Sequence, residues 1–561
     1  MAAGRGLDEA SSHANTGGAS TALLLGIDLS TQSVTVVFLD AGTNRIVHID
    51  TLNFDRELPQ FGTSAGLHVG KNGKVTSPVQ MWLVGLDRIL RRQERTLMGR
   101  VKAVSGSAQQ HGSIFWTADG LAALRCMAPA DSFSSNLYGG FALEDCPTWA
   151  DSSTQMECDA IESATGGPGA MAALTGSRAY CRFTGPQIAR VARTEPLVWK
   201  HTARVSLVSS FLTSLLVGHP APVDASDASG MNLMNVRTSE WCEELLEATA
   251  PGLAARLGTI VNPWESLGPI SPYCAARFGF VTDCLVIPAS GDNSCSVVGT
   301  GLACDQTAST LMVSLGTSDT LVGLTRSPRP GPEGHVMVSP RGPDEWFAML
   351  CYKNGALARE AVRDRVAGGC WKKFDDLVAS APPGNDGNLA MTLVMEEIVP
   401  VLPIRGSFRV DAQDEPVAAL SEAHEARAVV EARFLSMRVH AGNLGLPTAP
   451  SRIIATGGGS MSTSLTQVLA DVFNAPVLVA DSSEAAAVGA ALRAGHGLKC
   501  KKQARWVELL ASPLKDFKVM ATPNAQAAAA YPATLLKRFA AFERGLVAKA
   551  QKHPQAQQSR E

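Results

Sequence analysis

The sequence predicts an α/β protein built from two domains, and two observations lead to this fold class. The chain has 561 residues, which is more than a single hydrophobic core usually accommodates. One unusual pattern also occurs twice: a short apolar strand enters a turn rich in Gly, Ser and Thr, and a second strand returns. It spans residues 23–40 and again residues 310–325. We infer a duplicated domain with a cleft between the two copies, rather than an array of short repeats.

The composition is that of an ordinary globular protein. Apolar residues make up 45% of the chain and charged residues 18%, as in typical soluble domains. The formal net charge of −3 gives no general attraction to nucleic acid or to anionic membranes. The 12 cysteines form no C-x-x-C pair, so we expect reduced thiols in an intracellular, cytoplasmic protein. The apolar tract 205–217 is too short and too rich in serine to span a bilayer.

The elements of the first half follow from the hydrophobic pattern. Residues 1–20 are small and polar, which predicts a disordered tail without a targeting signal. Runs of aliphatic and β-branched residues predict strands, and apolar positions on one face predict a helix. These elements are the strands 23–28, 33–40, 45–54 and 101–105, and a helix from residue 78 to about 96.

The second half continues this α/β alternation, with glycines at the turns from strand to helix. The predicted strands are 284–287, the pair within 310–325, 452–456 and 477–481, and the predicted helices are 294–301, 421–442, 462–473 and 485–495. The basic run 499–505 is typical of a solvated connection. We place the first domain at residues 21–288 and the second at 289–545, followed by a flexible tail, 546–561.

Residues 288–299 lie near the middle of the chain and carry its most distinctive polar pair. Asp292 and Asn293 stand where a strand ends and a helix begins, a position at which N–H groups and polar side chains converge on ligands. A carboxylate there could accept the proton of a hydroxyl group that attacks a phosphoryl group, and Asn293 could bind a polyol. The alternative is a simple helix cap, for which Asp and Asn are also typical.

The two turns rich in Gly, Ser and Thr suit a polyphosphate. Ser314-Leu-Gly-Thr317 corresponds to Asp28-Leu-Ser-Thr31, and both offer backbone N–H groups and hydroxyls without steric bulk. Asp28 could hold Mg²⁺ through water. Either turn alone could be an ordinary hairpin turn, but their duplication favours a phosphate site.

Three further stretches offer polar or small residues to a ligand. His111, in Gln109-Gln-His-Gly112, stands at the carboxyl end of a strand, although a structural histidine is an equal alternative. Arg182 could donate several hydrogen bonds to sugar oxygens, and Arg178 is a rival of similar merit. The glycines 457–459 precede a helix and suit close approach of an adenosine group, where a plain turn is the default interpretation.

Taken in order, five motifs resemble the FGGY family of carbohydrate kinases and, within it, the xylulose kinases of the eukaryotic type. The motifs are Ile27-Asp-Leu-Ser-Thr-Gln32, Gln109-Gln-His-Gly112, Ser290-Gly-Asp-Asn293, Ser314-Leu-Gly-Thr-Ser318 and Ala455-Thr-Gly-Gly-Gly459. The resemblance covers about residues 23–498. It implies two actin/hexokinase-like (ribonuclease-H-like) domains that close on MgATP. It also implies D-xylulose as the phosphoryl acceptor, ADP and D-xylulose 5-phosphate as products, and a place in the pentose phosphate pathway.

The resemblance also implies roles for individual residues. The family's sugar contacts fall on His111, Arg182, Asp292 and Asn293, with Asp292 as the general base. Its nucleotide and metal contacts fall on Trp371, Gly458, Gly459, Ser462, Thr317, Thr31 and the metal-binding Asp28. Ser462 departs from the family pattern, because related chains carry Asn there.

Three other functions stay open at this point. The same fold could phosphorylate ribulose, glycerol or another polyol. The chain could also be a nucleotide-binding regulator built on an inactive kinase, or an actin-like ATPase that hydrolyses ATP without a sugar. Asp28, Asp292 and Thr317 are all present, which argues against an inactive relative. We expect a monomer or a homodimer.

Overall fold

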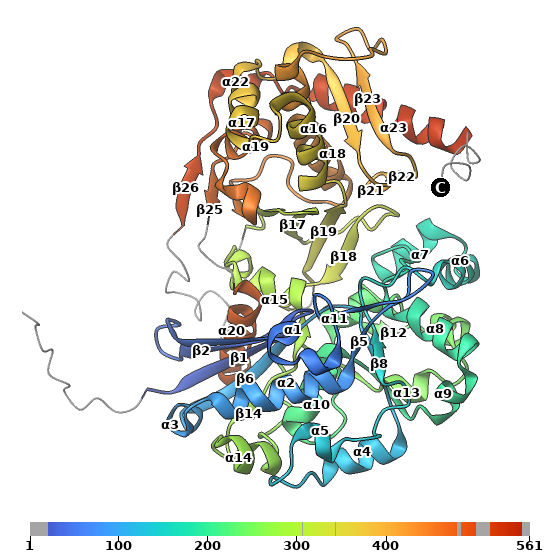
Figure 1. The fold of residues 1–561 in the computed structure, drawn as a ribbon, viewed down its shortest axis with the longest axis vertical. Helices are drawn as coiled ribbons and strands as arrows, with labels where there is room; N and C mark the ends of the chain where they lie inside the picture. Colours follow the sequence, from blue (N-terminus) through green and yellow to red (C-terminus); the bar gives the residue numbers. More distant parts are fainter. Residues whose placement is uncertain (1–20, 306, 343, 480–483, 501–516, 553–561) are drawn as a thin grey trace, which may run out of the picture.

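The computed structural model describes residues 21–305, 307–342, 344–479, 484–500 and 517–552. The predicted tail 1–20 and most of the basic run 499–505 lie outside these residues. Two lobes are stacked on each other, each centred on one large mixed sheet (Figure 1). Among the helices of the described ranges, none is long and apolar enough to cross a membrane.

The sheet of the first lobe has the order β14-β6-β1-β2-β3, with β15 beside β6. Its strands are β1 (Leu23–Leu29), β2 (Ser33–Asp40), β3 (Ile46–Asn53), β6 (Val101–Ala108), β14 (Leu285–Val286) and β15 (Ser290–Gly291). The strands β1, β6, β14 and β15 are parallel, while β2 runs antiparallel to both neighbours. Every residue of β1 is buried, as expected for a central strand covered on both faces.

The sheet of the second lobe has the order β18-β19-β17-β16-β24-β25-β26. Its strands are β16 (Thr310–Leu315), β17 (Asp319–Thr325), β18 (His335–Val338), β19 (Trp346–Tyr352), β24 (Arg452–Thr456), β25 (Val477–Val479) and β26 (Lys518–Ala521). The path β19-β17-β16-β24-β25 has the same order and strand directions as β3-β2-β1-β6-β14 in the first lobe. This shared topology confirms the duplicated α/β fold.

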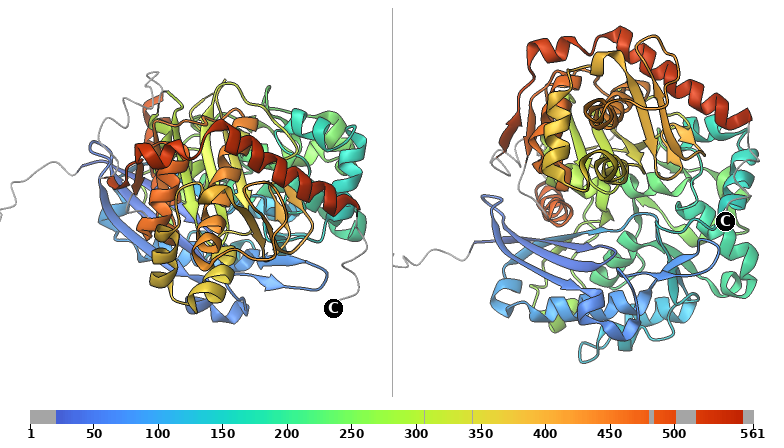
Figure 2. Two further views of the ribbon diagram at one scale, coloured as in Figure 1. Left: turned by 90° about the horizontal axis from the view of Figure 1, so that it is seen from above. Right: turned by 45° about the horizontal axis from the view of Figure 1, so that its top comes forward.

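Helices cover both sheets. Those of the first lobe include α2 (Val79–Arg92), α6 (Gln155–Ala164), α8 (Thr184–Thr194), α10 (Val208–Val217) and α11 (Ala225–Ala228). Those of the second lobe include α16 (Ala356–Ala367), α17 (Trp371–Ser380), α18 (Glu422–Asn443), α19 (Thr463–Phe473) and α23 (Ala533–Lys552). Figure 2 shows α23 running across the outside of the second lobe. Because α23 continues to Lys552 and buries Leu546 and Ala550, the flexible tail expected from residue 546 is wrong for residues 546–552.

One helix crosses from the second half of the chain to the first lobe. Helix α20 (Ala485–Lys499) packs on β1 and β6 and on α15 (Asp292–Gly299), at the junction of the lobes (Figure 1). A Cβ atom on Gly26 would lie 2.0 Å from the Ala487 carbonyl oxygen, and one on Gly299 would lie 1.8 Å from the Ala485 carbonyl oxygen. Only glycine allows these backbones to approach so closely. Because α15 and α20 both pack on the first lobe, that lobe includes residues beyond the boundary expected at residues 288/289.

Candidate active site

Three parallel strands of the first sheet end at the same edge. In their register, Asp28 of β1 lies opposite Ser107 of β6, and Ser107 lies opposite Ser290 of β15. The segment Gln109–His111 follows β6 directly, and Asp292 follows β15. Ligands of open α/β sheets collect at the carboxyl ends of such strands. The fold therefore brings together three of the predicted motifs, which are far apart in the sequence.

Asp292 is the first residue of α15, and the N-cap of that helix is Gly291, without a side-chain cap. The Asp292 Oδ1 accepts hydrogen bonds from the Asn293 backbone N (2.8 Å) and Nδ2 (3.1 Å). Burial, together with the neighbouring carboxyl groups of Asp28 and Asp227, raises the pKa of Asp292 to about 7. Asp292 is thus not the helix cap that one interpretation of the sequence assumed, and its carboxyl group can gain or lose a proton near neutral pH.

Asp28 lies near the end of β1 and accepts a hydrogen bond from Ser30. Burial raises its pKa. Its Oδ1 is buried without a hydrogen-bond partner, and the same holds for the Gln109 amide and the Ser294 hydroxyl. Buried polar groups normally find partners, so these unpaired atoms fit a hydrated cation and its phosphate ligands.

A protein-only metal cage is a different kind of site. In the described parts of the chain, no group of three or more His, Cys, Asp or Glu side chains could hold a metal ion. Mg²⁺ usually takes one or two carboxylates and completes its shell with water and substrate phosphates. A single carboxylate such as Asp28 is compatible with that kind of binding.

His111 has a left-handed backbone conformation, with φ of 73°. Its Nδ1 lies 2.9 Å from the Gly230 carbonyl oxygen, and its ring stacks on Phe183 with 4.3 Å between ring centroids. Burial and the charge of Arg182 lower the pKa of His111 to about 3, so the ring is neutral. Because Nδ1 faces an acceptor and carries the proton, Nε2 is left as a hydrogen-bond acceptor.

The two rival arginines have different surroundings. Arg178 is held in a bidentate ion pair with Glu162, with nitrogen-to-oxygen distances of 3.0 and 3.1 Å. The guanidinium group of Arg182 lies 4.7 Å from the Tyr180 ring centroid, and its Nη2 lies 2.7 Å from Nε2 of His335. His335 belongs to β18 of the other lobe, and no local pattern in the sequence could have associated it with Arg182.

Two buried side chains next to Asn293 had no individual role in the sequence analysis. Gln110 accepts a hydrogen bond from the Asn293 Nδ2 at 2.8 Å and donates one to the Asp227 Oδ1 at 3.3 Å. Burial, more than the nearby Asp224, raises the pKa of Asp227 to about 7. The sequence signal for Gln110 is its place in the motif Gln109-Gln-His-Gly112. The only sequence signal for Asp227 is that it forms a pair of nearby acidic residues with Asp224.

The turns predicted to bind phosphate connect β1 to β2 and β16 to β17. In the first turn, the Thr31 Oγ1 accepts a hydrogen bond from the Trp149 Nε1 at 2.9 Å. In the second turn, Thr317 is exposed. Gly457 (φ 80°) packs against this second turn, since a Cβ there would lie 2.7 Å from the Leu315 carbonyl oxygen. A Cβ on Gly458 would contact nothing within 4 Å, so open space lies over this glycine.

The remaining nucleotide candidates lie together in the second lobe. Trp371 is the first residue of α17, is 41% exposed, and has the Arg363 guanidinium 4.4 Å from its ring centroid. Ser462 is the N-cap of α19, where its Oγ accepts from the Leu465 N at 3.2 Å. The same hydroxyl donates to Oδ1 of Asp375 in α17 at 3.0 Å. This contact joins the start of α19 to the middle of α17 next to the glycine loop.

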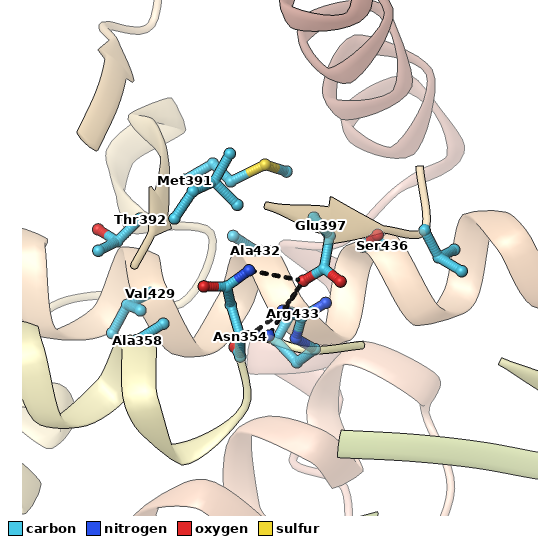
Figure 3. A pocket seen from close by; sticks show the side chains of 11 residues that line it. Asn354, Ala358, Met391, Thr392, Glu397, Val429, Ala432, Arg433 and Ser436 are labelled. Atoms are coloured by element: carbon cyan, nitrogen blue, oxygen red, sulfur yellow. Dashed lines mark hydrogen bonds and ion pairs between the residues drawn. The ribbon is translucent and has the colours of Figure 1, made fainter. Parts of the chain in front are cut away.

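The turn 316–318 is backed by buried ion pairs. Arg359 of α16 binds Asp319 in a bidentate pair, with distances of 2.7 and 3.0 Å, and the Ala356 N donates to the Gly316 carbonyl oxygen at 2.9 Å. Near this ion pair, a small pocket is lined by residues that include Asn354, Glu397 and Arg433 (Figure 3). The Arg433 Nη2 lies 2.9 Å from the Asn354 carbonyl oxygen and 3.1 Å from the Glu397 Oε2. The ion pair and the backbone hydrogen bond therefore hold the turn 316–318 against α16.

The chain matches known protein families over most of its length. Residues 141–299 match the N-terminal domain of the FGGY family of carbohydrate kinases, and residues 311–498 match its C-terminal domain. A mouse protein named xylulose kinase is 42% identical, over 94% of this chain and 95% of its own length. An Arabidopsis thaliana protein named xylulose kinase 2 is 40% identical, over 87% of this chain and 89% of its own.

A similar fold occurs among solved structures. The ligand-bound xylulose kinase of Lactobacillus acidophilus superimposes with a TM-score of 0.74 at 19% sequence identity, covering 94% of this chain and 99% of its own. At that identity the likeness concerns the fold alone. The family models and the sequence relatives carry the assignment, because the models match residues 141–299 and 311–498 and the relatives extend over most of the chain. The chain therefore belongs to the FGGY family of carbohydrate kinases.

Proposed function

We propose that this protein transfers the γ-phosphoryl group of ATP to D-xylulose and forms D-xylulose 5-phosphate and ADP. The observation that carries the proposal is the carboxyl group of Asp292, which lies near the carboxyl groups of Asp28 and Asp227 and has a pKa raised to about 7. A general base works best when its pKa is close to the working pH. The names of the mouse and Arabidopsis relatives support xylulose as the acceptor.

In this mechanism, Asp292 accepts the proton of the sugar hydroxyl that attacks the γ-phosphorus. Its two oxygens cannot donate once ionised, so the reacting hydroxyl is oriented with its hydrogen toward the carboxylate. His111 accepts a hydrogen bond from a second hydroxyl through Nε2, and Arg182 donates to sugar oxygens. His335 and Tyr180 hold the Arg182 guanidinium group in place.

The phosphates are bound by the two turns and the glycine loop. Thr31 and Thr317 supply hydroxyls and backbone N–H groups, Trp371 and Ser462 contact the adenosine part, and Gly458 and Gly459 allow it to approach the backbone. Asp28 would hold Mg²⁺, which when bound would supply positive charge against the phosphates. A cytoplasmic location, a monomeric or homodimeric state and a role in the pentose phosphate pathway remain predictions.

The test is ADP release measured with a coupled assay over D-xylulose, D-ribulose, glycerol, gluconate and no sugar. We expect D-xylulose to give the highest kcat/KM, with slow release in the absence of sugar. A higher kcat/KM for another acceptor would assign the protein to that acceptor. ADP release that no sugar accelerates would support an ATPase, and no release under any condition would support a nucleotide-binding regulator.

A further inference from the structure

Gln110 lies between an acidic residue and the Asn293 carboxamide. Its Nε2 donates to the Asp227 Oδ1 at 3.3 Å, and its Oε1 accepts from the Asn293 Nδ2 at 2.8 Å. Asp227 and Gln110 are 2% and 3% exposed, and the Ser209 hydroxyl donates to the Asp227 Oδ2 at 2.5 Å. These side chains form one continuous chain of hydrogen bonds from the core of the first lobe to Asn293.

The hydrogen bonds run in one direction when Asp227 is ionised, because a carboxylate only accepts. Asp227 receives hydrogen bonds at both of its oxygens, so the NH₂ group of Gln110 faces the carboxylate. The Met337 Sδ, a weak acceptor 4.0 Å from the same nitrogen, is compatible with this orientation. The Gln110 oxygen then faces Asn293, and the Asn293 amide must turn its own NH₂ group toward Gln110.

The same orientation uses both hydrogens of the Asn293 amide. One goes to the Gln110 Oε1 and the other to the Asp292 Oδ1, at 3.1 Å. Among the described residues, no donor forms a hydrogen bond with the Asn293 Oδ1. The Gly291 backbone packs closely against the contact between Gln110 and Asp227. A Cβ atom on Gly291 would lie 2.3 Å from the Gln110 Cγ and 2.6 Å from the Asp227 Oδ1. The Gln110 amide therefore has little room to rotate.

We propose that Asp227 and Gln110 are positioning residues that fix the Asn293 carboxamide with its Oδ1 free to accept a hydrogen bond from a hydroxyl group of the sugar. Asn293 then recognises a hydroxyl hydrogen and disfavours an acceptor that lacks this hydroxyl, because a bound sugar would shield the amide oxygen from water and leave it unpaired. The same amide donates to the Asp292 Oδ1. The hydrogen bonds from Asp227 through Gln110 to Asn293, called the relay below, therefore also orient the residue assigned as base. This inference rests on the proposed sugar kinase activity.

The first test compares Gln110→Leu with Gln93→Leu, with D-xylulose and ATP as variable substrates. Gln93 is a matched control, because it is also buried and also donates to a carboxylate, that of Asp50, at 2.8 Å, outside the proposed site. We expect Gln110→Leu to raise KM for D-xylulose by about tenfold or more, with KM for ATP unchanged and a Tm close to that of the control variant. An unchanged KM for D-xylulose would overturn the inference.

A second test reverses the relay. In Gln110→Glu two acceptor oxygens face each other at Asp227, so KM for D-xylulose should rise. Adding Asp227→Asn places a donor opposite the new carboxylate, while the side chain at position 110 still accepts from Asn293. The double variant should therefore recover most of the lost affinity. A merely structural role predicts recovery of Tm without any change in KM, and that result would overturn the proposal.

The outcomes also separate this inference from the proposed function. If the parent protein phosphorylates D-xylulose and the Gln110 variants keep its KM, only the positioning role is wrong. If the parent phosphorylates no sugar in the panel, the proposed function is wrong and the positioning role is refuted with it.

Discussion

Replacing Asp292 with Asn separates its catalytic role from its structural one. The Asn side chain keeps the size and an oxygen that can accept from the Asn293 backbone N, now at 2.8 Å from Oδ1, but it cannot take a proton. Loss of a general base costs about 10²–10⁴-fold in rate, which corresponds to about 3–5 kcal/mol in the barrier. We therefore expect kcat for D-xylulose to fall by at least about 100-fold.

The pKa of Asp292 provides a second measurement. With a pKa of about 7, kcat/KM of the parent should fall about tenfold for each pH unit below 7, because this parameter reports the free enzyme. The Asn variant should show no such slope. The buried carboxyl group binds its proton more tightly in the folded protein than in the unfolded chain, so its contribution to stability is lost as the pH rises from about 4 to 7.

The neutral side chain of Asp292→Asn avoids this loss. The Tm of the variant at pH 7 and above should therefore equal or exceed that of the parent. The measurements are kcat and kcat/KM at pH values from about 5.5 to about 8.5. A thermal melt is recorded on the same preparation. A variant that melts normally and turns over within a few-fold of the parent would refute the role of Asp292 as base.

Three further experiments test the rest of the site. Asp28→Ala should abolish most turnover and the Mg²⁺ dependence of ATP binding, with little change in D-xylulose affinity measured by calorimetry; an equal loss of sugar affinity would contradict the metal role. Arg182→Ala should raise KM for D-xylulose by about tenfold, whereas Arg178→Ala should mainly lower Tm, and the reverse result would exchange the two arginines. Arg359→Leu breaks a buried pair, which costs about 3–5 kcal/mol, and should raise KM for ATP. The control is Arg277→Leu, which breaks a similar bidentate pair with Asp87 of α2, at 2.6 and 2.8 Å, in the first lobe. It should lower Tm with no change in KM for ATP, and equal KM values in both variants would refute the role of the Arg359 pair.

Much of the fold could be predicted because its elements carry local signals. The strands that became β1, β2, β16 and β17 are apolar runs between turn residues, and Ser421 is the N-cap of α18 close to where the sequence pattern placed the start of that helix. The position of α20 on the other lobe could not be predicted, because its small residues fit either sheet. The prediction of a flexible tail from residue 546 overlooked the apolar residues Leu546, Val547, Ala548 and Ala550, of which Leu546 and Ala550 are buried in α23.

The site was predictable to the extent that its residues stand in motifs. Asp28 lies near the end of a strand, His111 and Asp292 follow strands, and parallel strands bring such positions to one edge. The partners that orient these residues could not be found in the same way. His335 meets Arg182 across the two lobes, and Asp227 meets Gln110 across 117 residues of chain, so both contacts depend on tertiary packing that no local pattern contains.

The place of α20 has a consequence for how the chain acquires its fold during synthesis. Leu24, Val37, Leu39 and Ala103 of the first sheet share a buried cluster with Ala487, Val488, Ala491 and Leu492 of α20. Domains generally fold as the ribosome releases them, yet this face of the first sheet stays open until residues 485–499 emerge. The nascent chain must therefore carry an apolar patch, a natural target for chaperones, through the translation of nearly the whole second lobe.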